Sequence, residues 1–347
     1  MHRKLLKGLY LALSGLVVLG LLAACASSAP TPTKEAEKAA EKAAQPATAK
    51  AITLKAATAW PKNTMENEAL WRLQDELKKR GSSVTFDYVG GPEAIPSFEL
   101  MEAIRSGNVD IALTTNAYNT TAIPAVLAAK LTPFTPAEER QNGVADLWNK
   151  IYQEKGNAYY IGRGMEGKKF RLYTNKEVKS SADFKGLRIR VTPIYKAFVE
   201  ALGAQPVTMD PGEVYTAMER NVVDGYGWPT AKISDYGWQE VTKYAVNPPF
   251  FEVDVLILMN LDSWKKLPKT EQDTIIEAMK TVENGIGPWV KSEVEKEEKF
   301  ITEKGVKIIT LSDGDKYVDL AYKAGWDEVM AQAPDYGPKL KEMLTKK

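Results

Sequence analysis

The sequence predicts an α/β fold of two lobes that share one long helix, and two observations support this prediction. Strand-like and helix-like segments alternate from residue 52 to residue 113, and the alternation starts again near residue 158. An almost unbroken helical pattern then runs from Thr270 to Gly305. At 1.5 Å per residue such a helix is about 50 Å long, which exceeds the width of one small domain.

The first alternation consists of expected strands at residues 52–57, 84–89 and 109–113 and expected helices at 65–80 and 98–106. This βαβαβ order favours a largely parallel sheet with helices on both faces. Because ligands of such sheets bind beyond the carboxyl ends of the strands, Trp60, Tyr88 and Asn116–Tyr118 are candidates for a binding cleft. Packing in the core or at its rim remains the alternative for each of them.

The second alternation has expected strands at residues 158–161, 170–174, 187–191 and 206–209, with Val222–Gly225 leading into a further strand. One helix is expected to begin at Pro193 and another after Asp210. Asp210 and Glu213 have the spacing of a capping box, in which each side chain binds the backbone of the other residue. Pro288 interrupts the long helical pattern and predicts a kink.

The composition excludes several classes of chemistry. The chain of 347 residues contains one histidine, His2, and one cysteine, Cys25, and both lie in the N-terminal segment. The rest of the chain therefore offers no Ser-His-Asp triad, no histidine base and no His/Cys zinc site. A disulfide within the chain is also excluded, since a single thiol has no partner.

The N-terminal segment has the pattern of a secretion signal. A basic stretch at residues 3–7 precedes an apolar run at 9–22, which is followed by Ala23-Ala24-Cys25. The run is too short to span a membrane, which takes about 20 apolar residues. Leu22-Ala23-Ala24-Cys25 resembles a bacterial lipobox, so residues 1–24 are predicted to be a signal peptide and Cys25 to be lipidated. An ordinary cleaved signal with an incidental cysteine is the alternative.

Residues 25–50 are expected to form a tether behind the lipidated cysteine. After Cys25 the segment contains only Ala, Pro, Thr, Ser, Lys, Glu and Gln, which cannot form a core. The predicted contact with the membrane is therefore the lipid anchor. The whole chain has a formal net charge of +1. A chain this close to neutrality gives no reason to expect a nucleic-acid partner.

Two short motifs match catalytic or nucleotide-binding patterns without the expected surroundings. Gly162–Lys169 fits the G-x-G-x-x-G pattern, but it precedes the strand-like run 170–174, whereas a phosphate site needs a helix next. A glycine-rich turn between lobes is the expected role. Ser263 and Lys266 have the S-x-x-K spacing, but no accompanying motif is present. Ser263 is expected to cap a helix.

The second alternation resembles one family closely. The resemblance rests on Phe184–Val191, Ala201–Val207, Pro211–Met218 and Val223–Gly225, and on Tyr88–Gly91 followed by Glu102–Asp110. These segments, in this order and spacing, are similar to the DctP-type solute-binding proteins of tripartite ATP-independent periplasmic (TRAP) transporters. The resemblance covers about residues 51–330.

The resemblance implies a two-lobed, periplasmic-binding-protein-like fold of type II-like architecture, with the long helix running across both lobes. Lobe I would contain residues 51–168 and about 254–295. Lobe II would contain residues 169–253 and about 296–347.

The resemblance also implies that Arg190 binds the carboxylate of the solute. A guanidinium is planar, stays charged and offers two parallel N–H groups to a carboxylate. An interstrand salt bridge is the alternative role of Arg190. Arg171 corresponds to a second arginine that assists the carboxylate in some members.

The chain departs from the family after the second-lobe helix, where many members read Asp-Gly-Gln-Glu-Asn-Pro. Here the run is Asp224-Gly225-Tyr226-Gly227-Trp228-Pro229, so Trp228 replaces an asparagine that touches the ligand. An indole offers an apolar face and one N–H donor, which predicts a less polar ligand, such as a 2-oxo acid or an aromatic monocarboxylate. Packing is the alternative role for Trp228. Tyr226, Glu213 and Tyr118 complete the candidate binding residues.

The predicted function is therefore that of an extracytoplasmic lipoprotein that captures an organic monocarboxylate by lobe closure. It would deliver this ligand to a TRAP membrane permease that is driven by an ion gradient. No cofactor, metal site or catalytic residue is predicted. Three alternatives remain: a binding protein of an ATP-driven importer, an exported carboxylate-dependent hydrolase, and a sensory or scaffolding lipoprotein.

Overall fold

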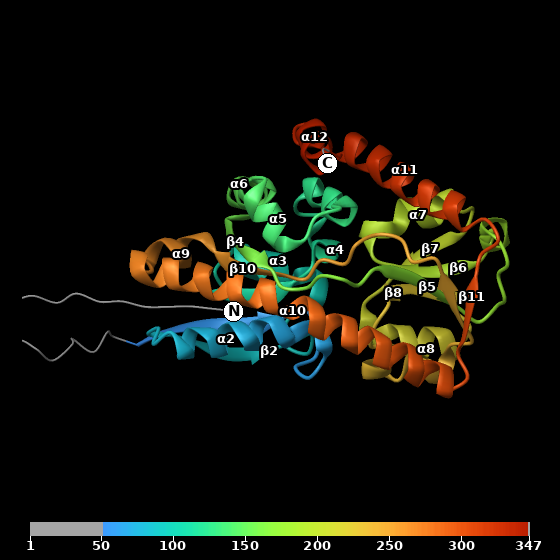
Figure 1. Ribbon diagram of the computed structural model, residues 1–347, viewed down its shortest axis with the longest axis horizontal. Helices are drawn as coiled ribbons and strands as arrows, with labels where there is room; N and C mark the ends of the chain where they lie inside the picture. The colour runs from blue at the N-terminus through green and yellow to red at the C-terminus, as the bar shows by residue number, and fades with distance from the viewer. Residues whose placement is uncertain (1–50, 346–347) are drawn as a thin grey trace, which may run out of the picture. The chain divides into compact units, whose positions relative to one another are not determined.

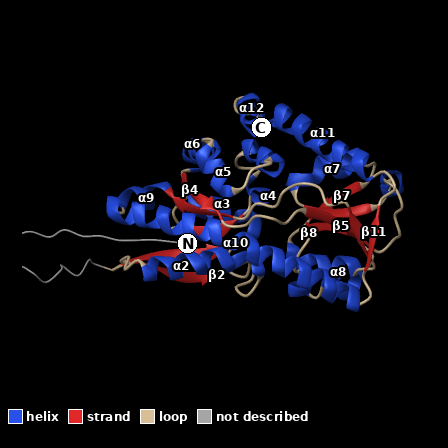
Figure 2. Ribbon diagram, viewed as in Figure 1, coloured by secondary structure: helices blue, strands red, loops and turns tan. Residues whose placement is uncertain are grey.

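A computed structural model describes residues 51–345 and confirms an α/β fold with two separate sheets (Figures 1 and 2). The predicted signal peptide, the lipidation at Cys25 and the tether lie outside these residues and stay predictions. Within residues 51–345, no helix is both long enough and apolar enough to cross a membrane.

Lobe I is built around a five-stranded sheet in the order β2-β1-β3-β10-β4. Its strands are β1 (Ile52–Thr58), β2 (Val84–Gly90), β3 (Ile111–Thr114), β4 (Ala158–Arg163) and β10 (Leu256–Asn260). β1 pairs in parallel with β2 and β3, which confirms the predicted βαβαβ unit. β10 lies antiparallel to both β3 and β4, so the sheet is mixed.

The helical segments of lobe I before β4 are short except for α2 and α6. They are η1 (Met65–Asn67), α2 (Glu68–Lys79), η2 (Ser97–Glu99), α3 (Leu100–Arg105), α4 (Asn116–Asn119), η3 (Pro124–Leu131), α5 (Pro136–Gln141) and α6 (Val144–Gly156). Helix α2 buries Leu70, Leu73 and Leu77 completely, at the spacing of one helix face.

Lobe II is built around a six-stranded sheet in the order β11-β9-β5-β8-β6-β7. Its strands are β5 (Phe170–Thr174), β6 (Arg188–Val191), β7 (Gln205–Thr208), β8 (Gly225–Pro229), β9 (Tyr244–Asn247) and β11 (Lys307–Thr310). Its shorter helical segments are η4 (Ser181–Phe184), η5 (Pro193–Tyr195), α7 (Lys196–Ala201), η6 (Pro211–Glu213), α8 (Val214–Glu219), η7 (Ile233–Tyr236) and η8 (Trp238–Val241).

Two extended segments, residues 164–169 and 248–255, cross between the sheets side by side (Figure 1). Val253 N donates to the Lys168 carbonyl at 3.1 Å, and Lys169 forms a bridge with Glu252. The Gly162–Lys169 motif therefore ends β4 and continues into a strand, as expected for a turn between lobes.

Helix α10 (Lys269–Glu303) confirms the prediction of one long helix shared by the lobes. Its first half packs on α2, β4 and α5, and its second half contacts η7 (Figure 1). There Ser234 N donates to Glu297 Oε1 at 3.0 Å. The helix continues through Pro288, and its 35 residues give a length of about 52 Å.

The C-terminal helices connect the lobes a second time. α11 (Gly314–Gln332) packs on α7 of lobe II and on η3 of lobe I, and α12 (Gly337–Thr345) packs on η3. An ion pair of 3.0 Å joins Lys155 of α6 to Asp335. Residues from about 296 to 347 were predicted to belong to lobe II, but the end of this range lies against lobe I.

Two cap predictions have different outcomes. The Asp210–Glu213 capping box is present, with Asp210 N donating to Glu213 Oε2 at 3.0 Å. The cap prediction for Ser263 is wrong, because Asn260 caps α9 (Leu261–Lys266) through its side-chain oxygen. Ser263 Oγ instead donates to Asp110 Oδ1 at 2.6 Å.

Candidate binding site

A small cavity lies where the strands of both sheets end. Lobe I contributes Trp60, Glu66, Thr115, Ala117 and Tyr118, lobe II contributes Phe170, Thr192, Tyr195, Trp228 and Pro229, and a crossing segment contributes Val253, Asp254 and Val255. Its volume is about 20 Å³, room for about one water molecule. A solute of several atoms therefore enters only when the lobes move apart.

The lobe I wall is aromatic. Trp60 follows β1 and Tyr118 lies in α4 after β3, with ring centroids 5.8 Å apart. Both side chains are buried, and burial raises the pKa of Tyr118 well above its ordinary value. Among residues 51–345, the Trp60 Nε1–H makes no hydrogen bond of normal geometry, although it lies near enough to the Tyr118 hydroxyl to oppose part of the increase in its pKa.

The lobe II wall combines strand ends with the start of a helix. Trp228 lies near the end of β8 and packs edge-on against Trp238 at 4.7 Å. Its Nε1–H likewise finds no acceptor within the described part of the chain. Tyr195, at the start of α7, packs against Phe170 at 5.1 Å. Tyr195, Thr192 and Phe170 were not predicted, although Thr192 directly follows β6.

Arg190 lies on β6 and is completely buried. Its Nε and Nη2 donate to the Met209 carbonyl at 3.0 and 2.8 Å, and Nη1 donates to the Tyr195 hydroxyl and the Gly227 carbonyl at 3.3 Å. Every one of these acceptors is neutral. No carboxylate of residues 51–345 forms an ion pair with Arg190. Its charge acts on Asp210, where it opposes part of the increase in pKa that burial causes, but no counter-charge touches the buried guanidinium.

The Arg190 guanidinium lies directly behind the cavity wall. Its carbon Cζ is 5.8 Å from the centre of the Trp228 ring, and Trp228 and Tyr195 both face the cavity. Its positive charge also acts on Tyr118, where it opposes part of the increase in pKa that burial causes. The charge of lobe II thus reaches the aromatic wall of lobe I.

Glu66 adds an acidic side chain that the sequence analysis missed. It lies in η1, lines the cavity and is 2% exposed. Its Oε1 forms an ion pair of 3.0 Å with Lys168, which is also buried. Lys168 belongs to a segment that crosses between the lobes, so no local pattern joins it to a glutamate 102 residues earlier.

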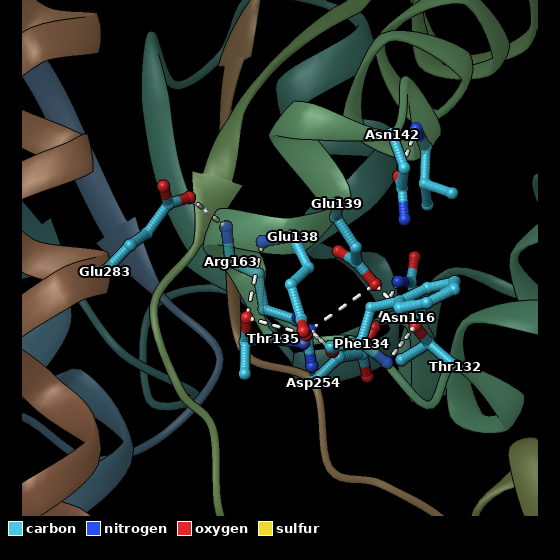
Figure 3. A network of polar contacts seen from close by, with 11 residues as sticks. Asn116, Thr132, Phe134, Thr135, Glu138, Glu139, Asn142, Arg163, Asp254 and Glu283 are labelled. Carbon is cyan, nitrogen blue, oxygen red and sulfur yellow. Dashed lines mark hydrogen bonds and ion pairs between the residues drawn. The ribbon is translucent and has the colours of Figure 1, made fainter. Parts of the chain in front are cut away.

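Asp254 is the second buried acid of the wall, and Figure 3 shows the polar network behind it. Its carboxylate accepts hydrogen bonds from Thr115 Oγ1 at 3.1 Å and from Asn116 Nδ2. Burial raises the pKa of Asp254, and these hydrogen bonds and the charge of Arg163 oppose the increase. Arg163 also pairs with the buried Glu139 at 3.3 Å.

The structure places Arg171 and Tyr88 away from the cavity. Arg171 Nη2 pairs with Glu298 of α10 at 2.6 Å. Tyr88 packs edge-on against Trp71 at 5.2 Å, and its hydroxyl lies 3.0 Å from Thr58 Oγ1. β2 is the outermost strand of its sheet, which explains why its end does not reach the cavity.

Tyr226 and Glu213 also lie outside the cavity lining. Tyr226 is completely buried, stacks on Tyr173 at 5.1 Å and shares a hydrogen bond of 2.8 Å with Thr242. Glu213 is exposed and serves the capping box of η6. Asn116 touches Asp254 from behind the wall.

Residues 56–332 match the DctP family, which is described as bacterial extracellular solute-binding protein, family 7. The chain belongs to this family. This confirms the resemblance in the sequence to TRAP-type extracytoplasmic solute-binding proteins.

Two curated relatives of this family 7 protein illustrate its range. An uncharacterized protein of Haemophilus influenzae is 34% identical over 177 residues, which cover 48% of this chain and 52% of the relative. The monocarboxylate 2-oxoacid-binding periplasmic protein of Nostoc sp. is 25% identical over 237 residues, which cover 64% of each protein. The matches thus span about half to two thirds of these relatives.

Solved structures share the fold of this family 7 protein. A TRAP periplasmic solute-binding protein from Desulfovibrio salexigens with bound orotic acid has a TM-score of 0.77 at 20% identity, covering 84% of this chain and 97% of that one. An extracytoplasmic solute receptor from Bordetella pertussis that binds pyroglutamic acid has a TM-score of 0.75 at 16% identity, covering 85% and 100%. The likeness confirms the two-lobed architecture.

Proposed function

We propose that this protein captures an organic monocarboxylate between its lobes and delivers it to a TRAP membrane permease driven by an ion gradient. The observation that carries the proposal is Arg190, a completely buried guanidinium whose hydrogen-bond acceptors are all neutral. Burying a charge without a counter-charge is costly. A ligand carboxylate would supply that counter-charge.

The walls of the cavity support a ligand with one carboxylate and a less polar body. The aromatic residues of the lining are Trp60, Tyr118, Phe170, Tyr195 and Trp228. A second ligand carboxylate would lie close to Glu66 or Asp254 and be repelled. The 2-oxo acids and aromatic or apolar monocarboxylates expected from the sequence have the required single charge.

The ligands named for three of the relatives are all acids. The Nostoc protein is named for monocarboxylate 2-oxoacids, and the two solved relatives hold orotic acid and pyroglutamic acid. Each of these ligands carries a carboxyl group, which supports the role proposed for Arg190. Their bodies differ, so they do not identify the ligand of this chain.

Anchoring through a lipidated Cys25 and cleavage of residues 1–24 belong to the same proposal. Several acyl chains would hold the protein at the membrane, since each buried CH₂ contributes about 0.8 kcal/mol. Mass spectrometry of the protein from its native membrane tests this part, because an unmodified Cys25 thiol would contradict it.

The function is tested by identifying the ligand and then removing the charge. Mass spectrometry of small molecules released from the purified protein is expected to find a monocarboxylate. In titrations followed by tryptophan fluorescence, Arg190→Ala should weaken its binding by at least about 100-fold, because the variant removes one partner of a buried charge pair.

Arg188→Ala is the matched control for this experiment. Arg188 lies on the same strand, but its side chain is 41% exposed and pairs with Asp224 at 3.0 Å. This variant should bind within about twofold of the unmodified protein. Release of an uncharged solute, or a loss below threefold in Arg190→Ala, would overturn the proposal.

A further inference from the structure

Four polar atoms of the cavity walls have no hydrogen-bond partner among residues 51–345. They are Trp60 Nε1, Trp228 Nε1, Thr192 Oγ1 and Glu66 Oε2. Buried polar groups are nearly always paired in folded proteins, so four such atoms around one cavity indicate that a ligand completes them. Whether each of these atoms donates or accepts a hydrogen bond determines which kind of ligand group can pair with it.

The two indole nitrogens and the carboxylate oxygen have opposite hydrogen-bonding roles. Trp60 Nε1 and Trp228 Nε1 can only donate a hydrogen bond. Glu66 Oε2 belongs to a carboxylate whose other oxygen pairs with Lys168, and a carboxylate oxygen only accepts hydrogen bonds. A ligand held between these walls must therefore present an acceptor to the indoles and a donor to Glu66.

The acidic group and the buried arginine belong to different lobes. Glu66 lies in η1 of lobe I, whereas Arg190 lies on β6 of lobe II. A ligand carboxylate is attracted by Arg190 and repelled by Glu66, so these two charges orient it with its carboxylate toward lobe II. The part of the ligand that lies beside its carboxylate then faces Glu66.

We infer that the ligand carries a hydrogen-bond donor, a hydroxyl or N–H group, which binds Glu66 Oε2 while its carboxylate faces Arg190. This inference rests on the proposed function and narrows its substrate class. It favours 2-hydroxy acids and N–H-bearing ring carboxylates over 2-oxo acids, whose oxo group and carboxylate are both acceptors. An acceptor placed against Glu66 would leave the buried Oε2 atom without a hydrogen-bond donor.

Matched pairs of acids test this inference on the unmodified protein. Pyrrole-2-carboxylate and 2-furoate have nearly the same shape, but the ring atom beside the carboxylate is an N–H donor in the first and an oxygen acceptor in the second. Lactate and pyruvate make the same comparison for a 2-hydroxy and a 2-oxo group. In fluorescence or calorimetric titrations, the acid that carries the hydrogen-bond donor should bind at least about 30-fold more tightly than the other acid of its pair.

Binding by the Glu66→Gln variant tests whether Glu66 causes the preference for acids that carry a hydrogen-bond donor. A glutamine amide can donate as well as accept, so the preference within each pair should shrink to about threefold or less. Glu68→Gln is the matched control, since Glu68 lies two residues away, pairs with Arg72 at 2.8 Å and does not line the cavity. It should retain the full preference.

The outcomes separate this inference from the proposed function. Equal binding within each pair, or tighter binding of 2-furoate and pyruvate, would overturn the inference and leave the carboxylate role of Arg190 intact. Binding of none of the four acids at millimolar concentration would overturn both. If Glu66→Gln fails to fold because Lys168 loses its partner, the relative binding of the paired acids to the unmodified protein still tests the inference.

Discussion

Asp224 is a buried carboxylate of lobe II that accepts several hydrogen bonds. It accepts from Arg188 N at 2.9 Å and from Arg188 Nε at 3.0 Å, and it pairs with Lys176 Nζ at 3.0 Å. The hydrogen bonds from Arg188 are the main cause of a strongly lowered pKa of Asp224. These contacts join the start of β6 to the turn before β8.

A lowered pKa makes the contribution of Asp224 to stability depend on pH. The ionised form stabilises the fold above the pKa of the unfolded chain, near 4, and this stabilisation is lost as the pH falls through the lower pKa of the folded state. Asp224→Asn should therefore lower the free energy of unfolding by about 1–2 kcal/mol at pH 7, since Arg188 is partly exposed.

Urea unfolding at several pH values measures this difference. The gap between Asp224→Asn and the unmodified protein should narrow below about pH 4 and vanish at more acidic pH. A gap that stays constant with pH would show that the asparagine acts through packing and not through charge.

Arg190 and Arg171 show what the sequence can and cannot predict about single residues. Both lie on strands of lobe II, and the family resemblance identified both as candidates. Their surroundings differ because Glu298, which binds Arg171, comes 127 residues later in the chain. Glu66 was missed for a similar reason, since its partner Lys168 is equally remote in sequence. Local patterns identify candidate charges, whereas distant residues decide their partners.

At the scale of elements, the glycines around the end of β4 are explained by close packing. A Cβ on Gly162 would lie 2.3 Å from Glu283 Oε1 and 2.8 Å from Met279 Cγ of α10. A Cβ on Gly164 would lie 2.3 Å from the Cβ of Ala69 in α2. Gly167 has a φ of +80°. The G-x-G-x-x-G spacing here thus reflects helix packing and a turn.

Gly162→Ala is expected to destabilise the protein. The added methyl group would push against Glu283 and Met279, and overpacking of this kind costs about 1–3 kcal/mol. It would also disturb the ion pair of Glu283 with Arg140, whose Nη2 donates to Glu283 Oε1 at 2.8 Å. Denaturant unfolding measures the loss.

Gly285→Ala is the matched comparison on α10. Gly285 is exposed, and a Cβ there would meet nothing within 4 Å among the described residues. Replacing glycine by alanine in an exposed helix should increase the free energy of unfolding by about 1 kcal/mol. A destabilised Gly285→Ala would mean that α10 needs flexibility there.

The elements themselves were largely predictable because their signals are local. The β5 strand coincides with the predicted residues 170–174, and β1, β2 and α10 agree within a few residues. The antiparallel position of β10 between β3 and β4 was not predicted, since strand pairing depends on contacts between distant segments. The return of α12 to lobe I was missed for the same reason.

For the whole molecule, the balance between open and closed lobes determines how tightly a ligand binds. In this structure the lobes touch beside the cavity, where Met65 N of lobe I donates to Asp235 Oδ2 of lobe II at 3.0 Å. Such a contact stabilises the closed form without touching the ligand. The apparent affinity depends on the fraction of protein that reaches this form.

Asp235→Ala should therefore weaken binding without changing specificity. Losing one hydrogen bond of about 1 kcal/mol would reduce the ratio of closed to open protein about fivefold, and the apparent affinity for every ligand would fall by up to that factor. Asp313→Ala is the matched control, because Asp313 Oδ1 accepts from Ser181 N at 2.9 Å entirely within lobe II. Small-angle X-ray scattering should show a larger radius of gyration only for Asp235→Ala, and equal effects in both variants would refute a role for this contact in closure.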